Sequence, residues 1–253
     1  MATPKLPSVY NLIALDSVDS TNAEAKRLAA RGEDDTPDGT LVWAGEQTAG
    51  RGRRGRDWDS PKGNLYCSLV LRPEVPIAEA SQLSFVAGLA VFDALAALSE
   101  PGHEVQLKWP NDILLNGKKV AGILLEAETA EDQTPPWLVL GLGLNVGSHP
   151  QDTDFPATSL RFEGWGSTDT DVLEAYCRRF LLWSSRWLDE GFAPVRKNWL
   201  WHCRGQGEEI SVRLENETIT GVFRDLDEEG ALVLDQDGKE RLITAGDVYF
   251  TDA

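Results

Sequence analysis

The amino-acid sequence predicts an α+β protein of two parts, a larger domain of strands and helices followed by a small β-barrel. Up to about residue 204, short apolar runs typical of strands alternate with segments whose apolar residues recur at helical spacing. From residue 209 to 250 only short β-patterned runs and hairpin turns remain. We therefore expect one domain over residues 1–204 and a second over residues 205–253.

Length and composition are those of a globular protein. The 253 residues suffice to bury a substantial core, with 42% apolar and 26% charged residues. The 41 acidic side chains outnumber the 24 basic ones, which gives a formal net charge of -17. A general nucleic-acid-binding protein needs a dominant basic face, so this balance argues against that class.

Nothing in the sequence predicts export, a membrane span or a metal cage. Residues 1–16 lack a signal peptide's basic start and apolar run, and Asp93 interrupts the apolar stretch 86–98. The three cysteines form no Cys-x-x-Cys pair, and the three histidines lack ligand spacing. We expect a soluble, cytoplasmic protein.

The first strand is expected over residues 11–15, with a helix directly after it. Residues 23–31 are strong helix formers. Thr21 and Glu24 stand at the spacing of a capping box, which would start this helix. A helix start accounts for Ser20-Thr21-Asn22, although its hydroxyls, amide and free N–H groups could also hold a polar ligand.

A loop rich in arginine and glycine joins the next two expected strands, residues 40–46 and 64–72. Four arginines and three glycines occupy residues 50–56. Glycine lets backbone amides form an anion-binding concavity, and arginine binds phosphate or carboxylate oxygens in pairs. Trp58 adds a flat face on which adenine could stack. We call residues 50–58 the arginine loop; a solvated loop or a nucleic-acid contact is the alternative if these residues are taken alone.

Three helices are predicted in the middle of the chain, and their apolar stripes are expected to form core. The first spans residues 78–99, the second residues 169–190, and a short third contains Trp199 and Trp201. The predicted core positions are Phe85, Leu89, Phe92, Leu95, Leu173, Tyr176, Phe180, Trp183 and Trp187.

Between these helices lies a hairpin with its turn at Asn116-Gly117, a strong hairpin signal between two apolar runs. The hairpin returns Lys119 to the side of Asn111 and Asp112. Such a pair is most often a surface ion pair of little worth, but here it flanks a Trp-Pro corner in an apolar setting, which favours a site.

A further buried strand is expected over residues 137–146. Gly141 and Gly143 alternate along it and leave one face bare. Glycine in a strand often marks close approach by a ligand or by another backbone. The barrel strands are then expected over residues 210–214, 219–224, 231–234, 240–244 and 247–250.

Together these segments resemble the biotin–protein ligases, the family of biotin–[acetyl-CoA-carboxylase] ligases, over nearly the whole chain. The resemblance implies a mixed sheet flanked by helices, related to class II aminoacyl-tRNA synthetases and lipoate ligases, followed by an SH3-like barrel. The matching elements are Ser20-Thr21-Asn22, Gln47 with the arginine loop, Lys108-Trp109-Pro110-Asn111-Asp112, Lys119-Val120-Ala121-Gly122 and Gly141-Leu142-Gly143-Leu144-Asn145.

The activity that the resemblance implies has two steps. Biotin and Mg-ATP form biotinyl-5′-AMP and pyrophosphate, and the biotinyl group then passes to a lysine of a biotin carboxyl carrier domain. The implied cofactors are ATP and Mg²⁺, and the partners are biotin, ATP and the carrier domain, without nucleic acid or membrane; a homodimer is left open. Only about a dozen residues precede the first strand, so we expect a ligase that is not a transcriptional repressor.

The resemblance also implies roles for residues. No covalent nucleophile is needed, because positioning and charge neutralisation carry a carboxylate's attack on phosphorus. Asp112 resembles a residue implicated in the transfer step, and Mg²⁺ would arrive with ATP rather than in a protein cage. The expected biotin-binding residues are Ser20, Thr21, Asn22, Gln47, Arg51, Gly52, Arg53, Lys119, Gly122 and Gly141. The expected ATP or adenylate residues are Arg53, Arg56, Trp58, Asn111, Lys119 and Asn145, and the expected catalytic residues are Arg51, Arg53, Asp112 and Lys119.

Three other functions are compatible with parts of the sequence. A lipoate or octanoyl ligase would share the fold, but the arginine loop and the Lys-Trp-Pro-Asn-Asp element argue against it. A nucleic-acid-binding protein using the arginine loop predicts steeply salt-sensitive binding. A degenerate ligase serving as a scaffold is disfavoured, because chemically competent residues fill all the matched positions.

Overall fold

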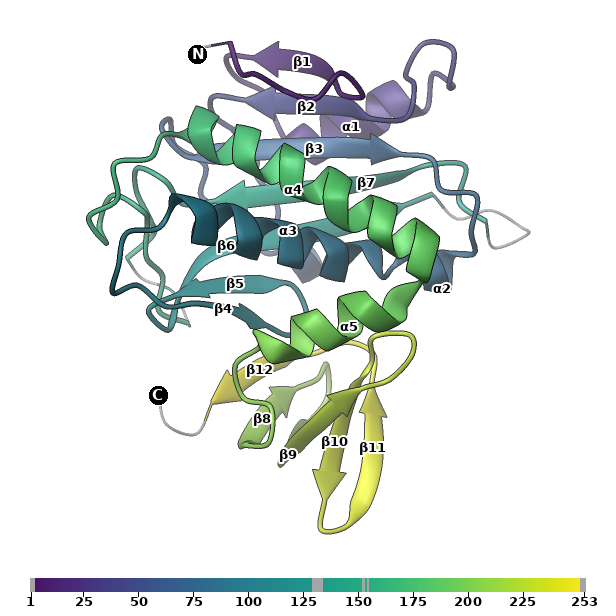
Figure 1. Cartoon of the computed structure of the whole chain (residues 1–253), viewed down its shortest axis with the longest axis vertical. Coiled ribbons are helices and arrows are strands. Elements are labelled where there is room, and N and C mark those ends of the chain that lie inside the picture. Colours follow the sequence, from purple (N-terminus) through teal and green to yellow (C-terminus); the bar gives the residue numbers. More distant parts are fainter. Residues whose placement is uncertain (1–2, 129–133, 152, 154, 251–253) are drawn as a thin grey trace.

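The computed structural model describes residues 3–128, 134–151, 153 and 155–250, which form a larger α+β domain and a small β-domain (Figure 1). A seven-stranded mixed sheet in the order β1-β2-β3-β7-β6-β5-β4 forms the centre of the larger domain. β1 and β2 pair in parallel, and each following pair is antiparallel. The strands are β1 (Asn11–Leu15), β2 (Thr40–Ala44), β3 (Leu65–Leu71), β4 (Val105–Lys108), β5 (Asp112–Leu115), β6 (Lys118–Ala127) and β7 (Leu138–Leu144).

Helices cover both faces of this sheet. α3 and α4 cross the face turned to the viewer in Figure 1, and α1 lies behind the sheet. α1 buries Ala25 and Leu28 against Val42, Val70 and Val139 of three neighbouring strands. The opposite face holds the main core. The helices are α1 (Thr21–Ala29), α2 (Ile77–Ala80), α3 (Leu83–Leu98), α4 (Asp169–Glu190) and α5 (Phe192–Trp201).

The start of α1 differs from the expectation that Thr21 and Glu24 form a capping box. Ser20 is the N-cap residue, and its hydroxyl accepts from the backbone N–H of Ala23. Thr21 is instead the first residue of α1. Its backbone N–H and hydroxyl donate to Gln47, and its hydroxyl oxygen accepts from Ser68 at 2.8 Å. The capping prediction was therefore wrong by one residue, since both the donor and the acceptor of the Thr21 hydroxyl are used by residues distant in the sequence.

The helix expected over residues 78–99 is divided into α2 and α3. Contrary to the sequence expectation, the segment Ile77–Leu98 is long and apolar enough to cross a membrane by length and composition alone. However, 61% of its apolar window is buried inside the protein. Asp93, which interrupts the apolar run, accepts a hydrogen bond from the indole of Trp183 on α4 at 2.8 Å. The segment therefore belongs to the core of the larger α+β domain.

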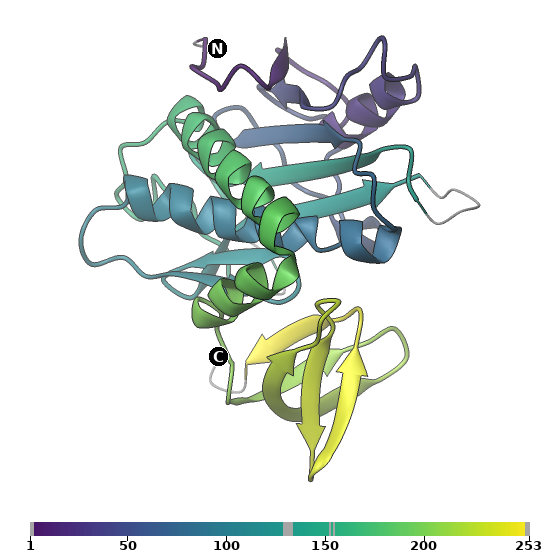
Figure 2. The same ribbon diagram turned by 45° about the vertical axis from the view of Figure 1, so that its right-hand side comes forward.

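The small domain is a five-stranded antiparallel sheet of the SH3-like type, in the order β11-β10-β9-β8-β12. It lies below α5 at one end of the larger domain (Figure 2). Trp109 connects the two parts, because its buried indole N–H donates to the carbonyl of Gly230 at 3.1 Å. The strands are β8 (Glu209–Arg213), β9 (Thr218–Leu226), β10 (Leu232–Gln236), β11 (Lys239–Ile243) and β12 (Asp247–Phe250).

Candidate active site

A cleft of about 280 Å³ lies over the α1 side of the large sheet, under the arginine loop and against the β12 strand of the small domain. Residues that are far apart in the sequence meet here because β5, β6 and β7 are adjacent strands. All the site residues predicted from the sequence line it: Ser20, Thr21, Asn22, Gln47, Arg51, Gly52, Arg53, Arg56, Trp58, Asn111, Asp112, Lys119, Gly122, Gly141 and Asn145.

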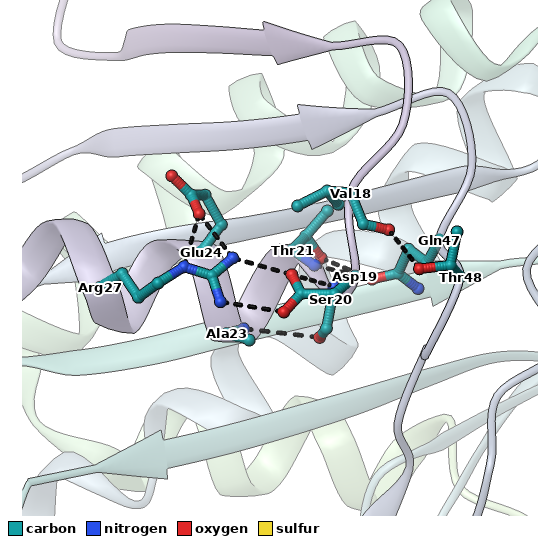
Figure 3. A network of polar contacts seen from close by, with 9 residues as sticks. All are labelled: Val18, Asp19, Ser20, Thr21, Ala23, Glu24, Arg27, Gln47 and Thr48. Atoms are coloured by element: carbon teal, nitrogen blue, oxygen red, sulfur yellow. Dashed lines mark hydrogen bonds and ion pairs between the residues drawn. The ribbon is translucent and has the colours of Figure 1, made fainter.

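One end of the cleft is a polar pocket at the start of α1 (Figure 3). The backbone N–H and the hydroxyl of Thr21 donate to Oε1 of Gln47 at 2.8 and 3.1 Å. The turn before the helix is held by Arg27, which donates to both oxygens of Asp19 at 2.8 and 2.9 Å. These hydrogen bonds lower the pKa of Asp19 to about 2. The residues on both sides of Ser20, Asp19 and Thr21, are thus held in place by hydrogen bonds.

Asn22 closes the floor of this pocket. Its Nδ2 donates to Glu126 at 2.8 Å, and its Oδ1 accepts from the buried hydroxyl of Ser68 at 2.6 Å. Glu126 also pairs with Lys26 at 2.6 Å. Burial raises the pKa of Glu126, but the hydrogen bonds from Lys26 and Asn22 outweigh that effect and lower it. The carboxylate therefore fixes the orientation of the Asn22 amide.

The bare glycine face of β7 is covered by side chains of the protein itself, where the sequence had suggested a ligand or another backbone. A Cβ at Gly141 would overlap the amide of Asn22. A Cβ at Gly143 would lie 2.6 Å from the indole of Trp58, and one at Gly122 would lie 3.2 Å from the same ring. The glycines hence make room for these two side chains. Among the described residues, the buried Trp58 indole N–H has no hydrogen-bond partner.

A cluster of charges occupies the middle of the cleft. The turn at Asn116 and Gly117, both with positive φ, brings Lys119 back so that its Nζ lies 2.6 Å from Asp112. Lys119 also lies 5.4 Å from the centre of the Trp58 ring. Asp112 has a second cation, Lys108, at 3.8 Å. A single carboxylate therefore serves two ammonium groups.

Lys108 is 5% exposed, and its Nζ lies 3.6 Å over the ring of Phe155. Burial lowers the pKa of Lys108 to about 8, against the opposing attraction of Asp112. The sequence placed Lys108 in a matched element but gave it no role. The charge pattern alone could not reveal a buried ammonium, because burial depends on Phe155 and on β12, which are distant in sequence.

The arginine loop closes like a short hairpin and reaches both domains. Trp58 N donates to the Gly50 carbonyl at 3.0 Å, which ties the two ends of the loop together. Arg53 donates to Oδ1 of Asn111 at 3.1 Å. Burial lowers the pKa of the Arg53 guanidinium. Arg56 donates to both oxygens of Asp247 on β12, at 2.7 and 2.8 Å.

Asp247 and its neighbours on β12 are further cleft residues that the sequence did not identify. Arg54 adds a third contact to Asp247, at 3.4 Å. Burial raises the pKa of Asp247, but the hydrogen bond and charge of Arg56 outweigh it and lower the pKa. Val248 and Tyr249 also line the cleft. No local signal distinguishes Asp247 from other acidic residues of the small domain, because its role depends on where that domain sits.

Asn145 also lines the cleft, although its side-chain N–H₂ already donates to the carbonyl of Thr158 at 3.0 Å. Among the residues that the structure describes, no three His, Cys, Asp or Glu side chains cluster as metal ligands would. The cleft therefore combines a polar pocket, a flat aromatic ring and several cations in one continuous space, an arrangement suited to a ligand with a polar head and an anionic centre.

Comparison with known proteins places this arrangement in context. Residues 57–201 match the model of the "biotin/lipoate A/B protein ligase family", and residues 206–251 match the "biotin protein ligase C terminal domain". The chain is 39% identical to the biotin–[acetyl-CoA-carboxylase] ligase of Paracoccus denitrificans, covering 93% of this chain and 99% of the relative. It is 35% identical to the bifunctional ligase/repressor BirA of Bacillus subtilis, covering 94% of this chain and 73% of that protein.

Solved structures agree. The structure of the biotin protein ligase from Aquifex aeolicus in complex with biotin and ATP superposes with a TM-score of 0.78 at 30% identity. The match covers 94% of this chain and 97% of the other.

Proposed function

This chain belongs to the biotin/lipoate A/B protein ligase family, and we propose that its cleft binds biotin and ATP side by side and joins them. Its activity is that of a biotin–[acetyl-CoA-carboxylase] ligase: biotin is activated to biotinyl-5′-AMP and then transferred to a specific lysine of a biotin carboxyl carrier domain. The observation that carries the proposal is the continuity of the polar pocket, Trp58 and the cationic cluster around Lys119 in one cleft.

The polar pocket suits the ureido head of biotin. Thr21 and Gln47 hold each other by two hydrogen bonds, and the hydroxyl of Ser20 accepts from the backbone N–H of Ala23, so hydroxyl and amide groups are presented in fixed orientations. The valeryl chain would then run over Gly122 towards Lys119. Arg51, Gly52 and Arg53 would cover the chain and the acyl phosphate, because they line the same cleft from the loop side.

The nucleotide would lie beyond Lys119, with its adenine on Trp58 and its phosphates near Arg53 and Arg56. In the first step the biotin carboxylate attacks the α-phosphorus, and the bond to pyrophosphate breaks. Two anions must meet, so Lys119 and the loop arginines contribute chiefly by neutralising and positioning them. Mg²⁺ bound to the phosphates of ATP, rather than held by a cage of side chains, would supply further positive charge there.

In the second step the amine of the acceptor lysine attacks the acyl carbon, AMP leaves and the amine loses a proton. Asp112 is the carboxylate that we propose to assist this proton loss, since it lies 2.6 Å from Lys119 at the expected reaction centre. The arginine loop would shield the mixed anhydride from water until the acceptor arrives.

We further propose a cytoplasmic location and a domain boundary at Gly205. The boundary is supported by α5 ending at Trp201 and β8 beginning at Glu209.

The test is ATP–pyrophosphate exchange with biotin, and with lipoate as the control acid. We expect exchange with biotin alone, followed by biotin transfer to a carrier domain. Exchange with lipoate alone would keep the mechanism and overturn the choice of acid. Absence of exchange with both acids would contradict the proposed reaction.

A further inference from the structure

A chain of three hydrogen bonds connects the polar pocket with the base of the arginine loop. The backbone N–H of Thr21 donates to Oε1 of Gln47 at 2.8 Å. Nε2 of Gln47 donates to the hydroxyl oxygen of Ser60 at 2.9 Å. That hydroxyl donates to the carbonyl oxygen of Trp58 at 2.7 Å. The hydrogen bonds thus run from Thr21 in the polar pocket to Trp58, the residue on which adenine is expected to stack.

The direction of this chain is fixed by chemistry at both ends. A backbone N–H can only donate and a backbone carbonyl can only accept, so the Gln47 amide has one orientation that satisfies Thr21. Its Nε2 can then only donate to Ser60, which sends the single Ser60 proton to Trp58. Hydrogen bonds aligned in one sense polarise one another, so the chain acts as a unit.

The packing around Ser60 leaves this chain little freedom. Ser60 is 6% exposed. A Cβ at Gly50 would lie 2.5 Å from the carbonyl oxygen of Trp58 and 2.9 Å from Nε2 of Gln47. Residue 50 therefore has to be glycine for these three hydrogen bonds to form. The backbone N–H of Gln47 donates to the Ser60 carbonyl at 3.1 Å, and that of Trp58 to the Gly50 carbonyl at 3.0 Å.

We propose that Ser60 is a positioning residue that couples the binding of the two substrates. A biotin head held at Thr21 and Gln47 fixes the Gln47 amide, and Ser60 transmits that restraint to the carbonyl of Trp58. The backbone N–H and the carbonyl of Trp58 are then both hydrogen-bonded, so the orientation of its ring is restrained for binding the nucleotide. Coupling of this kind is reciprocal, and ATP strengthens biotin binding by the same factor. The inference rests on the function proposed above.

The test is calorimetric titration of the full chain with α,β-methylene-ATP, with and without saturating biotin. The ratio of the two dissociation constants measures the coupling. In the parent we expect biotin to tighten binding of the analogue about 5-fold or more. In Ser60→Ala, which leaves Gln47 and Trp58 without their shared partner, the ratio should fall to about 1, the value without coupling.

Ser184→Ala is the matched control. Its hydroxyl also makes one hydrogen bond to a backbone carbonyl, that of Leu181 at 3.2 Å, but on α4. This variant should keep the parental ratio. If Ser60→Ala does not fold, Ser60→Cys replaces it. A thiol is similar in size to the hydroxyl but is a weaker hydrogen-bond donor and acceptor. This variant should give a ratio between the parental value and 1.

The outcomes separate this inference from the proposed function. If Ser60 were only structural, its substitution would lower both affinities and the melting temperature but would leave the ratio of dissociation constants unchanged. That result would overturn the inference. A parental ratio near 1, in a parent that still catalyses biotin-dependent exchange, would overturn the inference alone. A parent without biotin binding and exchange would overturn the proposed function and this inference with it.

Discussion

Lys119 has a polar partner in Asp112 and an aromatic one in Trp58, and it stands where biotin and ATP are expected to meet. We predict that Lys119→Ala slows biotin-dependent pyrophosphate exchange about 100-fold or more, because a positioned charge stabilises the transition state far more than it stabilises the fold. The melting temperature should change little. Exchange rates and thermal unfolding of the same samples measure the two effects.

The neighbouring lysine offers the control. Lys118 pairs with Glu163 at 3.7 Å and does not line the cleft, so Lys118→Ala should leave exchange near the parental rate. Equal losses of exchange in both lysine variants would show that the effect is one of general charge.

Lys108 gives a prediction about pH. Its pKa is lowered to about 8 by burial, so between pH 8 and its ordinary value near 10.5 the unfolded chain binds more protons than the folded one. The free energy of unfolding contributed by this group therefore rises with pH over that interval, and below pH 8 the buried charge destabilises the fold. Lys108→Met removes this penalty and keeps an apolar contact with Phe155.

Chemical denaturation of parent and Lys108→Met at pH 7 and pH 9.5 measures the effect. The advantage of the Met variant should be larger at pH 7 and should shrink at pH 9.5. A difference that stays constant between the two pH values would mean that Lys108 titrates outside this range.

At the scale of elements, the glycine face of β7 divides the cleft into two halves. We predict that Gly143→Ala weakens binding of α,β-methylene-ATP, because the new methyl group displaces Trp58, whereas Gly141→Ala weakens biotin binding by displacing Asn22. Displacement of a packed side chain costs about 1–3 kcal/mol. Calorimetry of both variants with both ligands gives the four affinities. Equal weakening of the same ligand by both substitutions would contradict this division.

The sequence predicted the elements better than their contacts. The turn at Asn116 and Gly117 was correctly located, because two residues with positive φ carry a local signal. The cap of α1 was misplaced, because Gln47, 26 residues away, binds the hydroxyl of Thr21. Likewise, Ser60 and Asp247 have no signal of their own, since each acts through groups that only the fold brings near. Local chemistry is readable from a sequence, whereas partners separated along the chain depend on strand order and domain placement.

At the scale of the whole molecule, the contact of Asp247 with Arg54 and Arg56 joins the small domain to the arginine loop. We predict that Asp247→Asn loosens the loop and increases release of free biotinyl-5′-AMP when no carrier domain is present. The increase should reach at most about 5-fold, because a partly exposed ion pair contributes no more than about 1 kcal/mol. Filtration followed by quantification of the free adenylate measures it.

Salt and a second aspartate provide the controls. High salt should raise adenylate release from the parent towards that of Asp247→Asn, since salt screens exposed charge pairs. Asp235→Asn breaks the pair with Arg224 inside the small domain and should leave release at the parental level. Release that is equal in the two aspartate variants would mean that the small domain acts through its stability alone.

The contact of β12 with the arginine loop also means that the site is completed only when the last strand has been synthesised. A ribosome completes the large sheet and the loop before it reaches Asp247, and domains fold as units in the order of their synthesis. A nascent chain, or one released early between residues 205 and 247, would thus carry the polar pocket and the loop cations without the carboxylate that fastens the loop. Such a product could make a reactive acyl adenylate that it is poorly equipped to retain.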